Sequence, residues 1–299
     1  MNSEQLEKLR PRINALDAIP TIPVIIQPLI SMLQLPADRV DLDKVAELIS
    51  YDKTIAAQCL RMANSPLFGR REVETVRKAV VVLGIRRVQS ILLCCSLNQV
   101  MPLEKWAFDA LAFWRHSLGC ALVTRKMAEM IGYPDPEKAY MAGLLHDLGI
   151  LVNSLVCTDQ YRKCVEDAAA RRISFDRAEQ EHLGFTHCQS GRILAERWSL
   201  SADLTDVIEF HHDVACAQCS PALVAMVHLS DLLCRVRELG YGYYEAMGLD
   251  LTGDVAWGCL FQHYPTLSNL DLARFTFDIE GAIDEITQLV DSVFGGKHH

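Results

Sequence analysis

The sequence lacks the features that define several large classes of proteins. It contains no run of 18 uninterrupted apolar residues, so no segment has the composition of a typical transmembrane helix. The polar N-terminal sequence MNSEQLEKLR does not resemble a signal peptide. No glycine-rich phosphate-binding loop and no Ser/His/Asp nucleophile arrangement is present. We therefore expect a cytoplasmic protein that does not enter a membrane.

Alternating apolar and polar residues, the pattern typical of half-buried strands, are missing as well. The apolar residues recur with helical spacing almost throughout, which predicts an all-α fold. The 11 cysteines are an odd number and are scattered along apolar segments. This distribution favours reduced core thiols over a disulfide framework.

The net charge of −9 argues against a surface that binds nucleic acid along its whole length. The charge is uneven, because residues 1–100 carry 13 basic and 10 acidic side chains, whereas residues 101–299 carry 16 and 28. Six cations are concentrated in one short span, namely Arg70, Arg71, Arg77, Lys78, Arg86 and Arg87. This span can hold an anionic ligand or an acidic partner, although a solvated helical face is the commoner explanation of such charge runs.

At 299 residues the chain is long enough for two lobes or one large domain. About five short helices predict an N-terminal lobe over residues 1–102. Residues 103–240 predict a second helical lobe. Residues 241–279 are rich in glycine and tyrosine and predict no clear element, and a closing helix follows, so we assign residues 241–299 to a C-terminal helical extension.

Capping residues indicate where the helices of the second lobe begin. Asp109 and Gly132 bracket one long helix. The pair Asp135-Pro136 is typical of a helix start, and the pattern predicts one helix from there through His146 and Asp147. A capping box at residues 186–189 (THCQ) predicts the start of another helix.

Five histidines and two aspartates lie on separate predicted helices of this lobe, in the order H…HD…H…HH…D. They are His116, His146, Asp147, His187, His211, His212 and Asp231. Imidazole nitrogens and carboxylate oxygens suit iron, manganese, zinc or nickel better than calcium, and we favour iron. Four of these residues make one site, and all seven can hold two ions with Asp147 as a bridge. The alternative is a hydrogen-bonded network in the core, because a lone buried histidine is more often satisfied in that way.

A second candidate is Cys216-Ala-Gln-Cys219, four residues beyond His212. It can be a thiolate metal site or a redox switch. A single CxxC pair is a weak signal, and two reduced loop thiols are the commoner outcome.

Short motifs extend over residues 15–240. In the N-terminal half they are residues 19–23 (IPTIP), 46–52 (AELISYD), 60–66 (LRMANSP), 68–69 (FG) and 79–84 (AVVVLG), followed by Val88. In the C-terminal half they are residues 114–117 (WRHS), 139–147 (AYMAGLLHD), Trp198 and 208–212 (IEFHH). Together they resemble the HDOD family, a bacterial regulatory branch of the HD superfamily related to the cyclic-di-GMP phosphodiesterases called HD-GYP. The resemblance implies an HD-domain-like helical bundle with an N-terminal helical lobe.

The resemblance also divides the candidate ligands between two metals. His116, His146, Asp147 and Asp231 match the first-metal set of the family's relatives. His187, His211 and His212 match the second-metal set. In the related hydrolases such ions activate a water molecule and hold the phosphate.

Two departures from the hydrolase pattern argue against turnover. Where the cyclic dinucleotide hydrolases read HD-x-G-K, this chain has Ile150 in place of the lysine. The loop after His212 lacks the Gly-Tyr-Pro signature and reads DVACAQC over residues 213–219. Losing both features removes transition-state stabilisation but leaves the metal ligands. We expect a non-catalytic signalling module that binds a protein partner or a nucleotide ligand. A metal-dependent phosphohydrolase and a metal-free helical scaffold are the alternatives.

Overall fold

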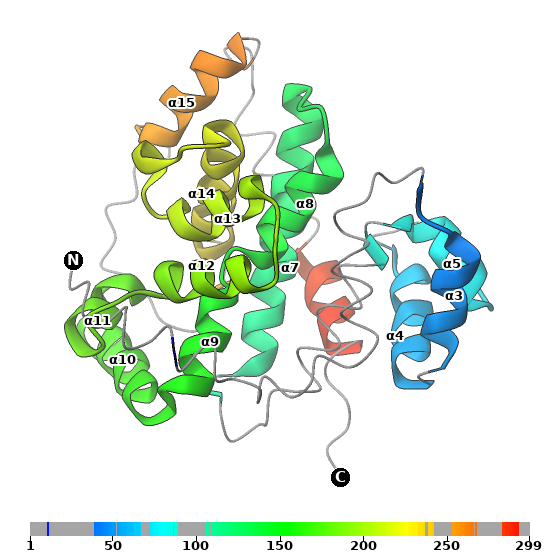
Figure 1. Cartoon of the computed structure of the whole chain (residues 1–299), viewed down its shortest axis with the longest axis horizontal. Coiled ribbons are helices and arrows are strands. Elements are labelled where there is room, and N and C mark those ends of the chain that lie inside the picture. Colours follow the sequence, from blue (N-terminus) through cyan, green and yellow to red (C-terminus); the bar gives the residue numbers. More distant parts are fainter. Residues whose placement is uncertain are drawn as a thin grey trace. The chain divides into compact units, whose positions relative to one another are not determined.

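Every regular element of the described chain is a helix, as the periodicity predicts (Figure 1). The computed structural model describes residues 11, 39–51, 53–66, 72–85, 87–88, 106–107, 109–236, 239–241, 253–265, 267 and 283–292. Within these ranges no β-strand occurs, which confirms the predicted all-α class. The chain divides into two compact units, one of residues 1–16 with 101–279 and one of residues 17–100 with 280–299. The finer boundaries at residues 102 and 240 remain a prediction.

The smaller unit contains α3 (Leu42–Ser50), α4 (Lys53–Ala63), α5 (Val76–Leu83) and a helical segment at residues 283–292. Asn64 fixes the connection that follows α4. Its side-chain amide donates to the carbonyl of Val73 at 2.9 Å, and its side-chain oxygen accepts from the N–H of Val73 at 2.8 Å. Asn64, the asparagine of the LRMANSP motif, therefore joins the end of α4 to the backbone at Val73.

The larger unit is built around the long helix α7 (Ala110–Ile131). Asp109 caps its start by accepting the N–H of Leu111 at 3.0 Å. Gly132 ends it in the left-handed conformation, with φ of 73°, which glycine adopts without strain. Both predicted ends of this helix are confirmed.

The HD pair lies at a break between two helices, and the predicted single helix through it is wrong. α8 (Pro136–Leu145) starts as predicted, with Asp135 accepting the N–H of Lys138, but it ends just before His146. α9 (Leu148–Val156) begins after Asp147. Nδ1 of His146 donates to the carbonyl of Gly143 at 2.8 Å, which competes with the backbone bond that would continue the helix through Asp147.

The stretch Pro136–Val156, which comprises α8 and α9, is long and apolar enough to cross a membrane by length and composition. Its residues are mostly buried inside the larger unit, as in the core helices of many proteins, so this test is weak support for a membrane span.

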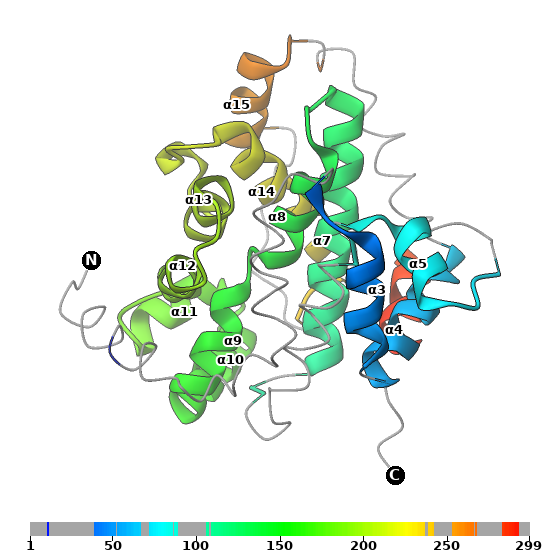
Figure 2. The ribbon, with the colours of Figure 1, turned by 45° about the vertical axis from the view of Figure 1, so that its right-hand side comes forward.

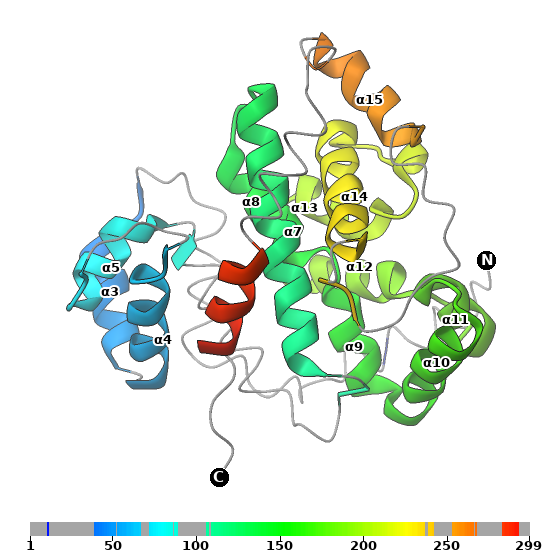
Figure 3. The same cartoon turned by 180° about the vertical axis from the view of Figure 1, so that it is seen from behind.

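The remaining elements of this unit complete a helical bundle around α7 and α8. They are α10 (Thr158–Arg171), α11 (Phe175–His182), α12 (His187–Arg197), α13 (Ala202–Phe210), the 3-10 turn η4 (Val214–Cys216), α14 (Pro221–Val236) and α15 (Val255–His263). Figures 2 and 3 show α7 beside α8, with α14 against α7 and α15. α11 and α15 are helices that the sequence did not predict.

Two glycines allow the close helix contacts that position the HD pair. A Cβ on Gly143 would lie 2.6 Å from the carbonyl oxygen of Cys120, so α8 can approach α7 only with glycine there. A Cβ on Gly149 would lie 1.8 Å from the carbonyl oxygen of His187, at the start of α12. These contacts bring α7, α12 and the α8–α9 junction together, and each of them carries a candidate ligand.

Candidate metal centre

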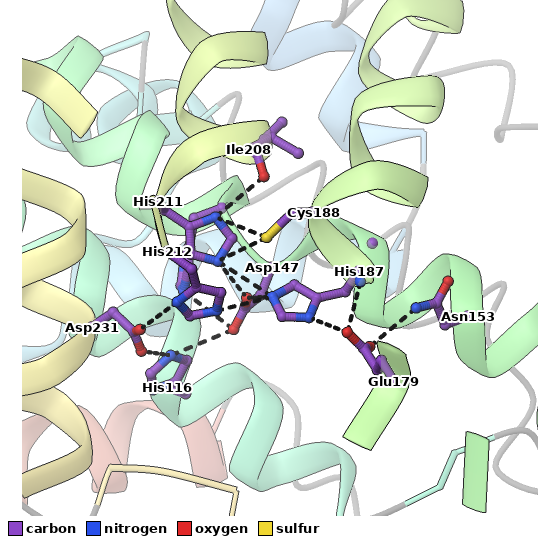
Figure 4. Close-up of polar contacts among 12 residues, drawn as sticks. His116, Asp147, Asn153, Glu179, His187, Cys188, Ile208, His211, His212 and Asp231 are labelled. Atoms are coloured by element: carbon purple, nitrogen blue, oxygen red, sulfur yellow. Dashed lines mark hydrogen bonds and ion pairs between the residues drawn. The ribbon is translucent and has the colours of Figure 1, made fainter. Parts of the chain in front are cut away.

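The predicted metal ligands converge on one buried cluster in the larger unit (Figure 4). They come from α7, the α8–α9 junction, the first turn of α12, the residues after α13 and the middle of α14; in that order they are His116, His146, Asp147, His187, His211, His212 and Asp231. All of them are buried except His212, whose side chain is 22% exposed. Residues spread over more than 100 positions of sequence thus share one site.

Asp147 lies at the centre of this cluster. Its Oδ2 is 3.5 Å from Nε2 of His116 and 3.1 Å from Nε2 of His146. Its Oδ1 is 3.4 Å from Nε2 of both His187 and His211. The two oxygens therefore face two different groups of imidazoles.

These groups define two candidate cation positions. The first position is bounded by Oδ2 of Asp147 with His116, His146 and Asp231, where Nε2 of His116 lies 3.1 Å from Oδ1 of Asp231. The second position is bounded by Oδ1 of Asp147 with the imidazoles of His187, His211 and His212.

Backbone carbonyls and one carboxylate fix the tautomers of four histidines. Nδ1 of His116 contacts the carbonyl of Leu239 at 2.7 Å, and Nδ1 of His211 contacts the carbonyls of Val207 and Ile208, each at 3.2 Å. Nδ1 of His146 and of His187 likewise face oxygen acceptors, those of Gly143 and Glu179. Because a carbonyl or carboxylate oxygen only accepts, we assign the proton to Nδ1 in each case. In the neutral ring Nε2 then carries a lone pair, and all four Nε2 atoms face the centre.

This arrangement fits a cation. Nε2 of His187 and Nε2 of His211 are 3.3 Å apart, so two lone pairs face each other in the neutral rings. Nε2 of His146 is buried and makes no hydrogen bond. A bound cation, or protons on the imidazoles, would satisfy these atoms. Nitrogen and oxygen donors of this kind suit first-row transition metals.

Both carboxylates of the cluster are held in the ionised form. Burial raises the pKa of Asp147, but His146 and His211 outweigh burial and hold this pKa well below its usual range. Burial also raises the pKa of Asp231, but the charge of Arg235 outweighs it, and Nε of Arg235 donates to Oδ1 of Asp231 at 2.7 Å. The site therefore holds two ionised carboxylates, and because Arg235 already balances Asp231, a bound cation would chiefly balance Asp147.

Sequence reasoning missed three residues that support the ligands. Glu179 on α11 is fully buried and contacts both Nδ1 and the backbone N–H of His187. Tyr241 donates its hydroxyl hydrogen to Oδ2 of Asp147, and its ring packs 4.7 Å from that of His116. Arg235, one helical turn after Asp231, was recognisable from its i, i+4 spacing. Glu179 and Tyr241 lie in segments whose sequence gives no such signal.

A thiol also belongs to the second position. Cys188 Sγ lies 3.9 Å from both ring nitrogens of His211. Burial raises the pKa of Cys188, but His211 and His187 outweigh burial and lower it to about 7. In turn, burial lowers the pKa of His211, while Cys188 and Asp147 raise it to about 10. Protons therefore compete with a cation for this group.

The structure describes three of the six cations of the predicted span. Arg70, Arg71 and Arg86 lie outside the described residues. Of the remaining members, Arg77 pairs with Asp43 at 2.5 Å and the amine of Lys78 donates to the carbonyl of Glu72 at 3.3 Å, while Arg87 is half-buried. A role of the span in ligand or partner binding stays a prediction.

Cys216, the last residue of η4, and Cys219, on the loop between η4 and α14, are exposed and do not belong to the cluster of ligands. The buried carboxylate of Asp206 accepts the backbone N–H groups of Gln218, Cys219 and Ser220 at 2.9 Å each. The loop is therefore held by its backbone, and a redox or metal role of the two thiols stays a prediction.

Comparison with known proteins assigns the family. The HDOD domain model matches residues 19–214. An HDOD domain protein of unknown function from Geobacter sulfurreducens is 29% identical, with a TM-score of 0.82 over 98% of this chain and 99% of that one. A candidate signal transduction protein from Marinobacter aquaeolei is 21% identical, with a TM-score of 0.77 over 97% of this chain and 65% of that one.

Two further relatives extend these comparisons. A candidate phosphohydrolase from Shewanella amazonensis is 21% identical, with a TM-score of 0.72 over 95% of this chain and 97% of that one. An uncharacterized protein of Treponema pallidum (strain Nichols) is 26% identical over 207 residues, which are 67% of this chain but only 38% of that protein. The chain thus matches well under half the length of this curated relative. The family match, the helical fold and the buried His/Asp cluster agree, and the chain belongs to the HDOD domain family.

Proposed function

We propose that this chain is a cytoplasmic regulatory HDOD module that holds a two-position metal centre and acts by binding a signalling partner. The observation that carries the proposal is the contrast within one site. All seven candidate ligands lie in the cluster, but among the described residues Ile150 stands in place of the phosphate-binding lysine and the centre is buried.

The argument for a metal centre rests on the cluster around Asp147. Its two oxygens lie 3.1 to 3.5 Å from four Nε2 atoms, distances that suit neighbouring ligands of a shared ion. The tautomers fixed by Leu239, Gly143, Glu179 and Val207 leave these nitrogens free to bind metal. His116, His146 and Asp231 would hold one ion, and His187, His211 and His212 the other.

The argument against phosphate binding rests on the burial of the residues around the centre. Ile150, at the place of the HD-GYP lysine, is buried in α9 and brings no cation to a substrate. The hydroxyl of Tyr241 donates a hydrogen bond to Oδ2 of Asp147, and the ring of Tyr241 is itself buried. A phosphate diester would have to displace such groups before it reached the centre. These features favour a centre that supports or senses over one that hydrolyses.

A metal-dependent phosphohydrolase acting on a nucleotide or cyclic dinucleotide is the second candidate. One observation favours it, because a carboxylate between two cation positions is the arrangement of two-metal phosphate hydrolysis. In that chemistry the ions lower the pKa of a bound water and stabilise the phosphate oxygens. His212, at the edge of the cluster, is the candidate ligand with appreciable solvent exposure.

Elemental analysis of the full chain, purified without a nickel column and with His298 and His299 removed, tests the metal centre. We expect one or two equivalents of iron, manganese or zinc, with iron favoured. Asp147→Ala should lose most of this metal while circular dichroism shows an intact helical fold. Asp159→Ala, at an exposed aspartate of α10, is the control and should keep the metal. Metal-free wild-type protein would overturn the proposal in favour of a protonated core network.

Phosphodiesterase assays separate the two metal-dependent candidates. The metal-loaded protein is incubated with bis(p-nitrophenyl) phosphate and with cyclic di-GMP. The regulatory proposal expects rates no higher than those of Asp147→Ala. Metal-dependent hydrolysis that this substitution abolishes would establish the phosphohydrolase instead.

A further inference from the structure

Cys188 lies among the imidazoles of the second cation position, where the sequence predicts only a core thiol. It follows His187 in the first turn of α12 and is 6% exposed. One ligand atom each from His187, Cys188, His211 and His212 lies within 4.8 Å of all the others. Figure 4 shows Cys188 reaching the ring of His211 from the side of α12.

Two of the separations between these atoms match those of a tetrahedral zinc site, and a third is close to them. With Zn–N bonds of about 2.0–2.1 Å and a Zn–S bond of about 2.3 Å, neighbouring nitrogens lie roughly 3.3–3.4 Å apart and a nitrogen and a sulfur about 3.6 Å apart. Nε2 of His187 lies 3.3 Å from Nε2 of His211 and 3.2 Å from Nε2 of His212. Sγ of Cys188 lies 3.9 Å from Nε2 of His211, about 0.3 Å more than in such a site.

The unsatisfied lone pairs around this position are an independent indication of a ligand. In the neutral rings that a bound cation requires, Nε2 of His187 and Nε2 of His211 face each other as acceptors, because their Nδ1 protons are engaged by Glu179 and by the carbonyl of Val207. At the neighbouring first position, Nε2 of His146 is buried without a hydrogen bond, 3.1 Å from Oδ2 of Asp147.

The two cation positions differ in their donors. Two carboxylates, those of Asp147 and Asp231, bound the first position, and such oxygen-rich sites suit iron or manganese. Three imidazoles, a thiol and Oδ1 of Asp147 bound the second, and a thiolate ligand selects softer ions such as zinc. Cys120 lies 3.5 Å from Nε2 of His116 at the first position, which makes it the matched comparison for Cys188.

We propose that Cys188 binds the ion of the second position through its sulfur, together with His187, His211 and His212, and that this position is selective for zinc. The thiol releases its proton to solvent on binding, so the ligand is the thiolate. This inference rests on the metal centre of the proposed function. It makes the centre asymmetric, with a harder ion on one side of Asp147 and zinc on the other.

X-ray absorption at the zinc edge tests the inference on the full chain without His298 and His299. Zinc-loaded wild-type protein should show a sulfur neighbour at about 2.3 Å beside nitrogen and oxygen neighbours at about 2.0–2.1 Å. Cys188→Ser should lose the sulfur neighbour and bind zinc at least about tenfold more weakly, with manganese affinity little changed. Cys120→Ser is the matched control and should keep the sulfur neighbour.

Each outcome has a distinct meaning. Stoichiometric zinc without any sulfur neighbour would overturn the role of Cys188 and leave the metal centre standing. A sulfur neighbour that survives Cys188→Ser but not Cys120→Ser would assign the thiolate to the first position and also overturn it. No zinc or other metal in the wild-type protein would remove both the inference and the proposed function. Where Cys188→Ser does not fold, the wild-type and Cys120→Ser spectra decide the question, because a sulfur neighbour present in both supports Cys188 and one lost in Cys120→Ser overturns its role.

Discussion

Oε2 of Glu179 accepts two hydrogen bonds from the same residue, His187, one from Nδ1 and one from the backbone N–H, each at 2.7 Å. The carboxylate thus fixes the ring tautomer and the start of α12 together. Its other oxygen accepts from the side-chain amide of Asn153 at 3.1 Å. Glu179 therefore holds His187 in the way that outer partners do in carboxylate–histidine–metal arrangements, where they orient the ligand and raise its basicity.

Glu179→Gln should weaken metal binding at the second position by about 10- to 100-fold, because the neutral amide no longer supports His187 as a ligand. Competition with a chromogenic chelator measures the affinity. Glu181→Gln, on the same helix but in exposed pairs with Arg171 and Arg177, is the control and should bind as the wild type does. Equal affinities of the two variants would show that Glu179 has no role in metal binding.

Gly149→Ala should destabilise the larger unit by about 3 kcal/mol or more, at the upper end of the effects of overpacking. The reason is that the new Cβ would lie 1.8 Å from the carbonyl oxygen of His187, an atom of the backbone that cannot move without shifting α12. Gly258→Ala, in α15 with nothing within 4 Å of the new Cβ, should be neutral or stabilising by up to about 1 kcal/mol. Urea unfolding of both variants measures the difference. A Gly149→Ala protein as stable as Gly258→Ala would mean that α9 and α12 are not packed as described.

Local signals made much of the fold predictable. The ends of α7 follow from Asp109 and Gly132, and the start of α12 follows from a capping box, in which Gln189 accepts the N–H of Thr186 at 3.1 Å. α11 was missed because its sequence is mostly polar and only one turn of it packs inward, through Phe175, Ala178 and Glu179. The break at the HD pair was missed because it depends on a side-chain bond to Gly143, which periodicity does not report.

The sequence also predicted which residues are the candidate ligands, but it did not predict the residues that support them. Histidines and aspartates stand out in apolar helices, since their burial requires compensation. Tyr241 contacts Asp147 from 94 positions away, and no local pattern relates the two. Cys188 was read as a core thiol because the imidazoles of His211 and His212 approach it only in the folded chain.

We expect Asp203 to contribute to the loss of folding stability at acidic pH. Burial raises its pKa, but hydrogen bonds from Lys138, at 2.6 Å, and Ser220 outweigh burial and lower it below its usual value. Because the folded pKa lies below the unfolded one, the contribution to stability is present above about pH 4 and is lost as the pH falls toward the folded pKa. Asp203→Asn should therefore flatten the fall of stability in this acidic range, as measured by urea midpoints from pH 6 downward. Lys138→Met, which removes the main donor, should flatten it too. A slope unchanged in both variants would assign the acid sensitivity to other groups.

Tyr241→Phe should weaken metal binding by about tenfold, the lower end of the effect of losing an outer partner. The substitution keeps the ring that packs on His116 and removes only the hydroxyl that donates to Oδ2 of Asp147. Without that donor the buried carboxylate is less well fixed toward the first position, and the metal-free protein should also lose about 1–3 kcal/mol of stability. Tyr264→Phe, whose ring pairs with that of Tyr133 at 6.4 Å, is the matched control. Tighter metal binding in Tyr241→Phe would instead mean that the hydroxyl competes with the ion for Asp147, so that Tyr241 closes the first position until a metal displaces it.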